Sequence, residues 1–290
     1  MRVIDLVHFG IEQLELAGID QAALEVDLLL GFCLKKNRSG LFLTATMEVD
    51  ARRECEFLTL LRRRAGHEPT AYILGETEFW SLPFLVTPDV LIPRPETEFL
   101  LETILGVIKG RPAQSGLALD LCCGSGVIGI VLALETEKTL IAVDLSATAL
   151  QVARKNAIRH QVSDRLVLLQ ADLFNAFIPD PIFSLVVSNP PYVGIHELQA
   201  SVQPEVRDFE PWLALDGGED GLDIIHRIRE MLPRLLKPGG DFFMEIGADQ
   251  GPAVLELFAG ENGLAVFDQA EVLPDYTGRD RVLHARMIVQ

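Results

Sequence analysis

The sequence has few of the features that mark secreted, membrane-spanning or nucleic-acid-coating proteins. Its four cysteines include no CxxC pair, so neither a disulfide framework nor a metal site is expected. No apolar run approaches the roughly 20 residues that cross a bilayer, and the first residues lack the apolar core of a signal peptide. Positive charge is scarce: 25 Lys+Arg against 42 Asp+Glu give a net charge of −17, which argues against affinity gained mainly by neutralising phosphates. We expect a cytoplasmic protein with reduced cysteines and no membrane contact.

Hydrophobic residues make up 49% of the 290 residues, enough for a packed core and more than one domain. Up to about residue 75 they recur at three- and four-residue steps, which predicts helices. From Thr77 to Ile92 aromatic, β-branched and turn residues alternate as in a pair of strands, and Pro93–Glu98 then starts a helix. After Gly116 short apolar runs alternate with helical stretches, which predicts an α/β fold with a mostly parallel sheet covered on both faces.

Within this α/β part, strands are expected at 117–121, 140–143, 166–169, 183–187, 241–246, 264–267 and 282–288, a helix at 222–236 and a turn at 238–240. The glycine-rich turn after the first strand is the first candidate site. Gly124, Gly126 and Gly129 let a ligand approach the backbone at the start of a helix, whose N–H groups are free. The same spacing occurs in dinucleotide-binding proteins, so the turn alone does not separate NAD from another adenosyl cofactor.

Acidic residues follow the next two strands. Asp144 comes 20 residues after Gly124, where a carboxylate can accept both hydroxyls of a ribose or can simply stabilise the start of a helix. Asp172 could accept from an adenine amino group while Leu173 packs on the ring, or it could cap a helix.

The fourth strand runs into Asn189-Pro190-Pro191-Tyr192, which favours one class of ligand. The two prolines fix the backbone and leave carbonyl oxygens free to accept, Asn189 adds an amide oxygen, and Tyr192 adds a flat ring. We interpret this tetrapeptide as a receptor for a planar –NH₂ group, which a dehydrogenase does not need. Our hypothesis is that Asn189 Oδ1 and the Pro190 carbonyl accept its two protons and hold its nitrogen in place, without a general base.

At these residues the chain resembles the release factor glutamine methyltransferase family, within the S-adenosylmethionine-dependent enzymes of Rossmann-like fold. The resemblance covers essentially the whole chain. It rests on Gly75–Trp80, Val90–Glu98, the glycine-rich turn, the Asn189–Tyr192 tetrapeptide, Phe209–Pro211, Leu215–Gly221 and Gly278–Arg281. The IPRPETE stretch within Val90–Glu98 is the most specific of these motifs.

The resemblance implies a seven-stranded, mostly parallel methyltransferase sheet. It implies a helical substrate-recognition domain at residues 1–75, a β-hairpin linker at 76–92 and a methyltransferase domain at 93–290. The implied reaction moves a methyl group from S-adenosyl-L-methionine to the side-chain amide nitrogen (N5) of the glutamine in the Gly-Gly-Gln motif of class 1 peptide chain release factors. S-adenosyl-L-homocysteine is the second product. The release factor is the expected partner, the protein is expected to be a monomer, and no direct contact with nucleic acid is expected.

The resemblance also assigns residues to roles. Catalysis falls on Asn189, Pro190 and Tyr192, and substrate binding on Asn189, Pro190, Pro191 and Tyr192. Cofactor contacts fall on Cys122, Cys123, Gly124, Ser125, Gly126, Asp144, Asp172, Leu173 and Asn189.

Some features leave alternatives open. The family usually has glycine and a small hydroxyl residue where this chain has Cys122-Cys123, so a positive φ at Cys122 would mean strain. Arg94, Glu96 and Glu98 either shape the site entrance or form a buried, helix-capping ion pair. Arg279–Arg281 is expected to be a surface turn.

Other functions compete with the one implied. An adenine-N6 methyltransferase acting on DNA or RNA would use the same tetrapeptide, although the net charge of −17 counts against it. A nicotinamide dehydrogenase would use the glycine-rich turn but leaves the tetrapeptide unexplained. An inactive binding module would not need an intact pair of acceptors.

Overall fold

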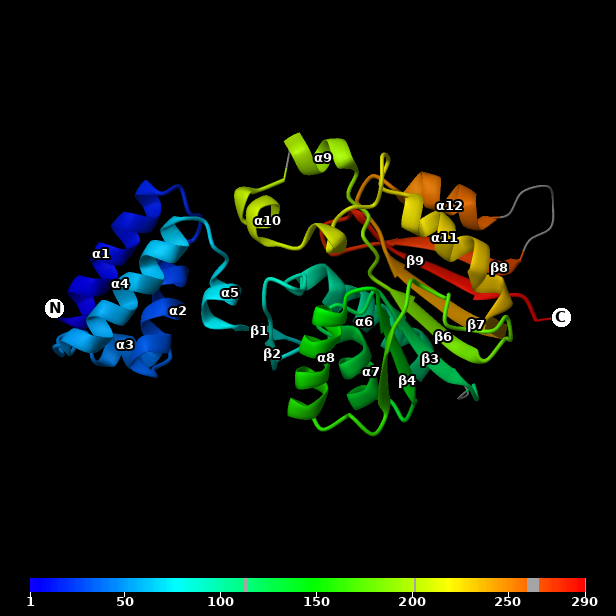
Figure 1. Cartoon of the computed structure of the whole chain (residues 1–290), viewed down its shortest axis with the longest axis horizontal. Coiled ribbons are helices and arrows are strands. Elements are labelled where there is room, and N and C mark those ends of the chain that lie inside the picture. The colour runs from blue at the N-terminus through cyan, green and yellow to red at the C-terminus, as the bar shows by residue number, and fades with distance from the viewer. Residues whose placement is uncertain (112–113, 201, 260–265, 290) are drawn as a thin grey trace. The chain divides into compact units, whose positions relative to one another are not determined.

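The structure is a computed structural model that describes residues 1–290 except 112–113, 201, 260–265 and 290. The chain forms two compact units (Figure 1). The smaller unit contains Met1–Thr77 together with Gln203–Phe209, and the larger contains Glu78–Val202 and Glu210–Gln290. Domain limits at residues 75 and 92, and the recognition role expected for the first segment, stay predictions.

The smaller unit is built from helices, as the periodicity predicted. Their bounds are α1 Val3–Leu16, α2 Ala22–Leu34, α3 Arg38–Leu43, α4 Ala51–Ala65, α5 Thr70–Leu74 and α10 Pro204–Phe209. Asp50 caps α4 by accepting from the Arg53 N–H, and the apolar face of α4 buries Phe57 in the core of this unit. Arg64, only 3% exposed, lies 2.6 Å from Glu205 of α10, which ties the distant 203–209 segment to this unit.

A short hairpin follows, formed by β1 (Glu76–Phe79) and β2 (Leu82–Leu85). Trp80 and Ser81 connect the two strands with φ of 56° and 55°, the left-handed values that a two-residue hairpin turn needs. The expected strand pair is therefore shorter than the 77–92 segment suggested. Residues 86–94 form no strand, and Pro88 and Pro93 exclude regular pairing there.

The larger unit contains a seven-stranded sheet with the order β5-β4-β3-β6-β7-β9-β8, in which β9 is antiparallel to both of its neighbours. This confirms the predicted α/β fold with a mostly parallel sheet. The strands are β3 Leu117–Leu121, β4 Leu140–Asp144, β5 Leu166–Gln170, β6 Phe183–Ser188, β7 Leu236–Glu245, β8 Phe267–Pro274 and β9 Asp280–Met287. The helices are α6 Pro95–Lys109, α7 Val127–Glu135, α8 Ala147–Arg159, α9 Ile195–Ala200, α11 Asp223–Met231 and α12 Gly251–Ala259.

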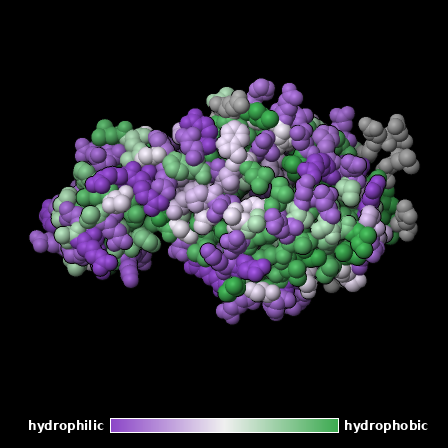
Figure 2. Space-filling model, in the orientation of Figure 1, coloured by the Kyte–Doolittle hydropathy of each residue, from purple (hydrophilic) through white to green (hydrophobic). Residues whose placement is uncertain are grey.

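Helices cover both faces of this sheet (Figure 1). On one face α6 and α7 bury Leu100, Ile104 and Ile130 in one core, and on the other α11 and α12 bury Ile228 and Phe258 in a second core. Figure 2 shows hydrophobic residues gathered over β3 and β4 on the viewed face of the larger unit.

Three expectations at the C-terminal end of the chain need correction. The helix expected at 222–236 ends at Met231 and continues as a 3₁₀ turn over Leu232–Arg234, because Pro233 cannot extend the α-helix. The turn expected at 238–240 is an excursion inside β7, whose pairing with β6 jumps from Leu236 to Asp241. The strand expected at 264–267 lies partly outside the described residues, and β8 begins at Phe267, where that strand was expected to end.

Within the described residues, the helices are all too short or too polar to span a bilayer.

Candidate functional site

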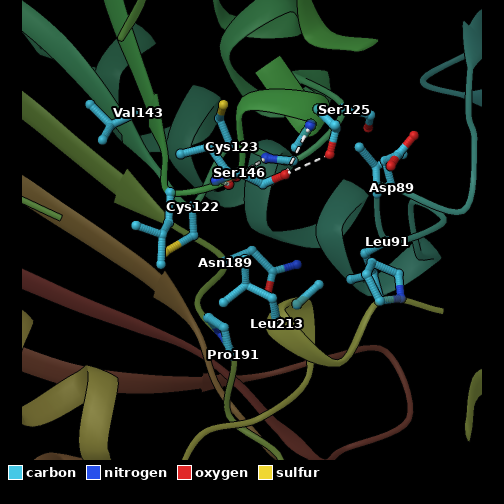
Figure 3. A pocket seen from close by; sticks show the side chains of 18 of the residues that line it. Asp89, Leu91, Cys122, Cys123, Ser125, Val143, Ser146, Asn189, Pro191 and Leu213 are labelled. Carbon is cyan, nitrogen blue, oxygen red and sulfur yellow. Dashed lines mark hydrogen bonds between the residues drawn. The ribbon is translucent and has the colours of Figure 1, made fainter. Parts of the chain in front are cut away.

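The candidate site lies where the chain leaves the carboxyl ends of neighbouring parallel strands. The strand that follows β3 along the chain, β4, lies on one side of β3, whereas β6 lies on its other side. The connections after β3 and β6 therefore run in opposite directions, which opens a crevice at the carboxyl ends of these two strands. A cavity of about 280 Å³ opens there (Figure 3). Its walls include the following predicted site residues: Cys122, Cys123, Gly124, Ser125, Asp144, Asp172, Leu173, Asn189 and Pro191. Gly126 does not line the cavity and instead precedes α7, close to Ala153.

The glycine-rich turn carries unusual backbone at its first position. Cys122 has φ of 59°, the left-handed value that costs about 1–2 kcal/mol for a residue with a Cβ. Cys122 therefore carries the strain that was expected for a positive φ at this position. Burial raises the pKa of both the Cys122 and Cys123 thiols, so neither is poised as a reactive thiolate.

Asp144 at the end of β4 holds this turn in place. Its Oδ2 accepts the Gly124 N–H at 2.8 Å, and its Oδ1 accepts the Ser146 N–H at 2.8 Å. Each carboxylate oxygen has a second lone pair, so both can still accept a hydroxyl from the cavity. Burial raises the pKa of Asp144, while these backbone bonds oppose the shift.

Asp172 has a partner that the sequence did not indicate. Arg227 of α11 donates from Nη2 to Asp172 Oδ2 at 2.7 Å, and both residues line the cavity. Both side chains are 40% or more exposed, so this pair contributes little stability. The ion pair with Arg227 orients the Asp172 carboxylate at the cavity wall.

A second aspartate lies beneath the turn. Asp120 of β3 is fully buried, its Oδ2 accepts the Gly129 N–H at 2.9 Å, and its Oδ1 has no hydrogen-bond partner among the described residues. Burial raises its pKa to about 8, and the negative charge of Asp144 adds to this effect. A Cβ at Gly129 would lie 3.0 Å from Asp120 Oδ2, which accounts for the third glycine of the turn.

We expect the folded protein to lose stability between about pH 4 and pH 8 because of Asp120. An unfolded aspartate releases its proton near pH 4, whereas folded Asp120 keeps it up to about pH 8, so ionisation in this range favours unfolding. The expected loss across this range is on the order of 5 kcal/mol. Asp120→Asn, which is neutral at every pH, should remove this part of the slope in chemical denaturation, while the same change at exposed Asp268 should not. An unchanged slope in Asp120→Asn would refute the assignment.

The Asn189–Tyr192 tetrapeptide follows β6 and borders a second, smaller cavity of about 160 Å³. Asn189, Pro190 and Tyr192 line it, and Asn189 and Leu91 also line the larger cavity. The two cavities therefore meet at Asn189. Figure 3 shows Asn189 and Pro191 opposite the turn that carries Cys123 and Ser125.

Polar side chains behind the tetrapeptide form one hydrogen-bonded chain. Asn189 Nδ2 donates to Thr97 Oγ1 at 3.2 Å, and Thr97 Oγ1 donates to Glu245 Oε2 at 2.7 Å. The Tyr192 hydroxyl donates to the other carboxylate oxygen, Glu245 Oε1, at 3.1 Å. Glu245 is 1% exposed, and its burial raises its pKa while the bonds from Thr97 and Tyr192 oppose the shift.

The backbone of the tetrapeptide is clamped by the Leu215–Gly221 motif and by Gln250. Gln250 Nε2 donates to the carbonyls of Tyr192 at 3.0 Å and of Gly221 at 3.2 Å. A Cβ at Gly221 would lie 2.3 Å from Tyr192 O, and one at Gly217 would lie 2.9 Å from Tyr192 C. These glycines are therefore required by close approach of the backbone.

The IPRPETE stretch combines both of the roles that the sequence left open. Pro93 and Thr97 of this stretch line the larger cavity, and Arg94 lines the smaller one while forming a 2.6 Å ion pair with buried Glu210. Glu98 accepts the Trp80 N–H. The surface turn expected at Arg279–Arg281 is wrong for Arg281, which is 9% exposed and donates to Ile246 O. Its positive charge opposes the rise that burial causes in the pKa of Glu245.

Comparisons with known proteins agree with this architecture. Two family models match, the PrmC N-terminal domain over residues 5–75 and the methyltransferase small domain over residues 95–207. A methyltransferase of Pyrococcus furiosus shares the fold, with a TM-score of 0.52 at 13% identity over 73% of this chain and 91% of that chain. The protein is thus a methyltransferase with an added helical part.

Relatives over the full length specify the family. The release factor glutamine methyltransferase of Cereibacter sphaeroides is 40% identical over 288 residues, which cover 99% of both chains. The one from Koribacter versatilis is 40% identical over 280 residues, covering 96% of this chain and 95% of the relative. The chain belongs to the release factor glutamine methyltransferase family and is an enzyme. A dehydrogenase and an inactive module gain no support from these relatives.

Proposed function

We propose that this protein methylates the side-chain amide nitrogen (N5) of the glutamine in the Gly-Gly-Gln motif of class 1 peptide chain release factors, with S-adenosyl-L-methionine as the donor. Near-full-length relatives at 40% identity support this proposal. The observation that carries it is the meeting of two cavities at Asn189, one beside the glycine-rich turn and one beside Pro190 and Tyr192.

The residues of the larger cavity suit an adenosyl cofactor. Asp144 keeps one lone pair on each oxygen for a pair of ribose hydroxyls, and Leu173 and Leu145 provide apolar wall. We propose that Cys122 to Ser125, Asp144, Asp172, Leu173 and Asn189 contact this cofactor, with Gly126 shaping the turn. When bound, the cofactor supplies an electrophilic methyl group on a sulfonium.

The smaller cavity would hold the substrate amide. An amide nitrogen is a weak nucleophile, because its lone pair is delocalised into the carbonyl. Asn189 Oδ1 and the Pro190 carbonyl would accept hydrogen bonds from its two N–H groups. These bonds fix the nitrogen in place and favour the positive charge that develops on it. Pro191 would fix the backbone that follows Pro190, and the Tyr192 ring would pack against the glutamine side chain.

Methyl transfer to defined acceptors tests the proposal. Wild-type protein with methyl-labelled S-adenosylmethionine should label a full-length class 1 release factor but not the same factor with the Gly-Gly-Gln glutamine changed to alanine. Duplex DNA is the control for the adenine-N6 alternative and should stay unlabelled. Label in the DNA, or in the altered release factor at the wild-type level, would overturn the assignment.

A further inference from the structure

The side chain of Asn189 could fit its place in two ways. Its amide can rotate by about half a turn and exchange the carbonyl oxygen with the –NH₂ group, which have nearly the same shape. Only the oxygen can accept a hydrogen bond from the N–H of a substrate amide. In the rotated form a donor would face a donor, and the site would repel the group it has to hold. Some part of the protein must therefore fix the orientation of this amide.

Thr97 and Glu245 have the contacts that this task requires. Asn189 Nδ2 lies 3.2 Å from Thr97 Oγ1, and Thr97 Oγ1 lies 2.7 Å from Glu245 Oε2. Thr97 is 2% exposed and Glu245 is 1% exposed, so water does not compete for these bonds. Thr97 belongs to α6 and also lines the larger cavity, whereas Glu245 belongs to β7, so two separate elements hold this chain of bonds.

The hydrogen bonds that Thr97 and Tyr192 donate stabilise the ionised form of Glu245 against the burial that raises its pKa. The direction of each bond follows from this charge. An ionised carboxylate only accepts hydrogen bonds, so the single Thr97 proton goes to Glu245 and the Tyr192 hydroxyl donates to the other oxygen. Thr97 Oγ1 is then left with lone pairs alone and can only accept from Asn189. The –NH₂ end of Asn189 must therefore face Thr97, and Oδ1 faces away from it.

We propose that Thr97 and Glu245 are positioning residues that lock the Asn189 side-chain amide with its oxygen available to the substrate amide, an inference that rests on the proposed function. A buried carboxylate is costly where an apolar side chain would pack as well. Glu245 lines neither cavity, so contact with the cofactor or substrate does not account for it. The hydrogen bonds that it accepts from Thr97, which in turn accepts from Asn189, and from Tyr192 do account for it.

Substitutions at Thr97 separate this role from a packing role. Thr97→Val keeps the shape but removes the hydroxyl, and we expect kcat on a release factor to fall about 10- to 100-fold with a smaller change in KM. Thr97→Ser keeps the hydroxyl and should restore most of kcat. Thr103→Val is the matched control, because Thr103 of the same helix donates only to its own backbone at Phe99 O, and it should leave kcat unchanged. Wild-type kcat in Thr97→Val, or equal losses in Thr97→Val and Thr97→Ser, would overturn the proposal.

A readout without release factor keeps the inference separate from the proposed function. In protein labelled with ¹⁵N-asparagine, the Asn189 side-chain signal is identified by its loss in Asn189→Ala. One of its two –NH₂ protons should exchange with solvent at least about 10-fold more slowly than those of exposed asparagines. Glu245→Gln can donate to Thr97 and should abolish this protection. Rapid exchange in the wild type would refute the lock, whereas protection without any labelling of a release factor would refute only the proposed function.

Discussion

Asn189→Ala is expected to lower turnover on a release factor by about 100- to 1,000-fold. The substitution removes the side-chain acceptor at the point where the two cavities meet, so the substrate amide loses one of the two bonds that fix its nitrogen. Cofactor affinity should change much less, because the turn, Asp144 and the rest of the larger cavity are untouched. Single-turnover methyl transfer and calorimetric titration of the cofactor measure the two effects separately.

Asn189→Asp is the informative companion variant. It keeps an oxygen toward the substrate but replaces the –NH₂ group that donates to Thr97. We therefore expect a loss close to that of Asn189→Ala, because a second carboxylate facing Thr97 competes with Glu245 for its single proton. Near-normal turnover in Asn189→Ala would show that the amide is held by other groups.

Gly221→Ala is expected to destabilise the protein by about 3 kcal/mol or more, because strain and a steric clash add at one residue. Gly221 has φ of 78°, and a Cβ there would lie 2.3 Å from Tyr192 O. The Tyr192 backbone would have to move, so turnover should fall about 100-fold even where the variant stays folded. Urea denaturation and methyl transfer measure the two consequences.

Gly278→Ala provides the matched control for this prediction. Gly278 has a closely similar φ of 82°, but a Cβ there meets no atom within 4 Å among the described residues. It should show the strain alone, about 1 kcal/mol, with turnover unchanged. Equal losses of stability in the two variants would mean that the contact with Tyr192 carries no energy.

Much of this site is predictable from the sequence because its parts lie at the ends of strands. The carboxyl ends of neighbouring parallel strands meet at one edge, so turns after strands at Cys122, Asp144, Asp172 and Asn189 converge by topology alone. The alternation of apolar runs with helical stretches predicted these parallel strands. The Asn189–Tyr192 tetrapeptide then favoured a planar amino group over a nicotinamide.

The supporting side chains were not predictable in the same way. Thr97 and Glu245 are 148 residues apart, and each has an ordinary local explanation, one as a polar residue in the first turn of a helix and one as the end of a strand. Arg227 is likewise one polar residue of an amphipathic helix until the fold brings it to Asp172. Contacts between distant segments leave no periodic signal.

The path of the chain has a consequence for the independence of the two units. Residues 203–209 belong to the smaller unit, where Glu205 contacts buried Arg64, although the flanking residues on both sides belong to the larger one. The polypeptide therefore crosses between the units at three places, and the two units are not separate stretches of the chain. Removing the first 77 residues would remove Arg64 and with it the ion pair that Glu205 of α10 makes, which would leave α10 without this contact.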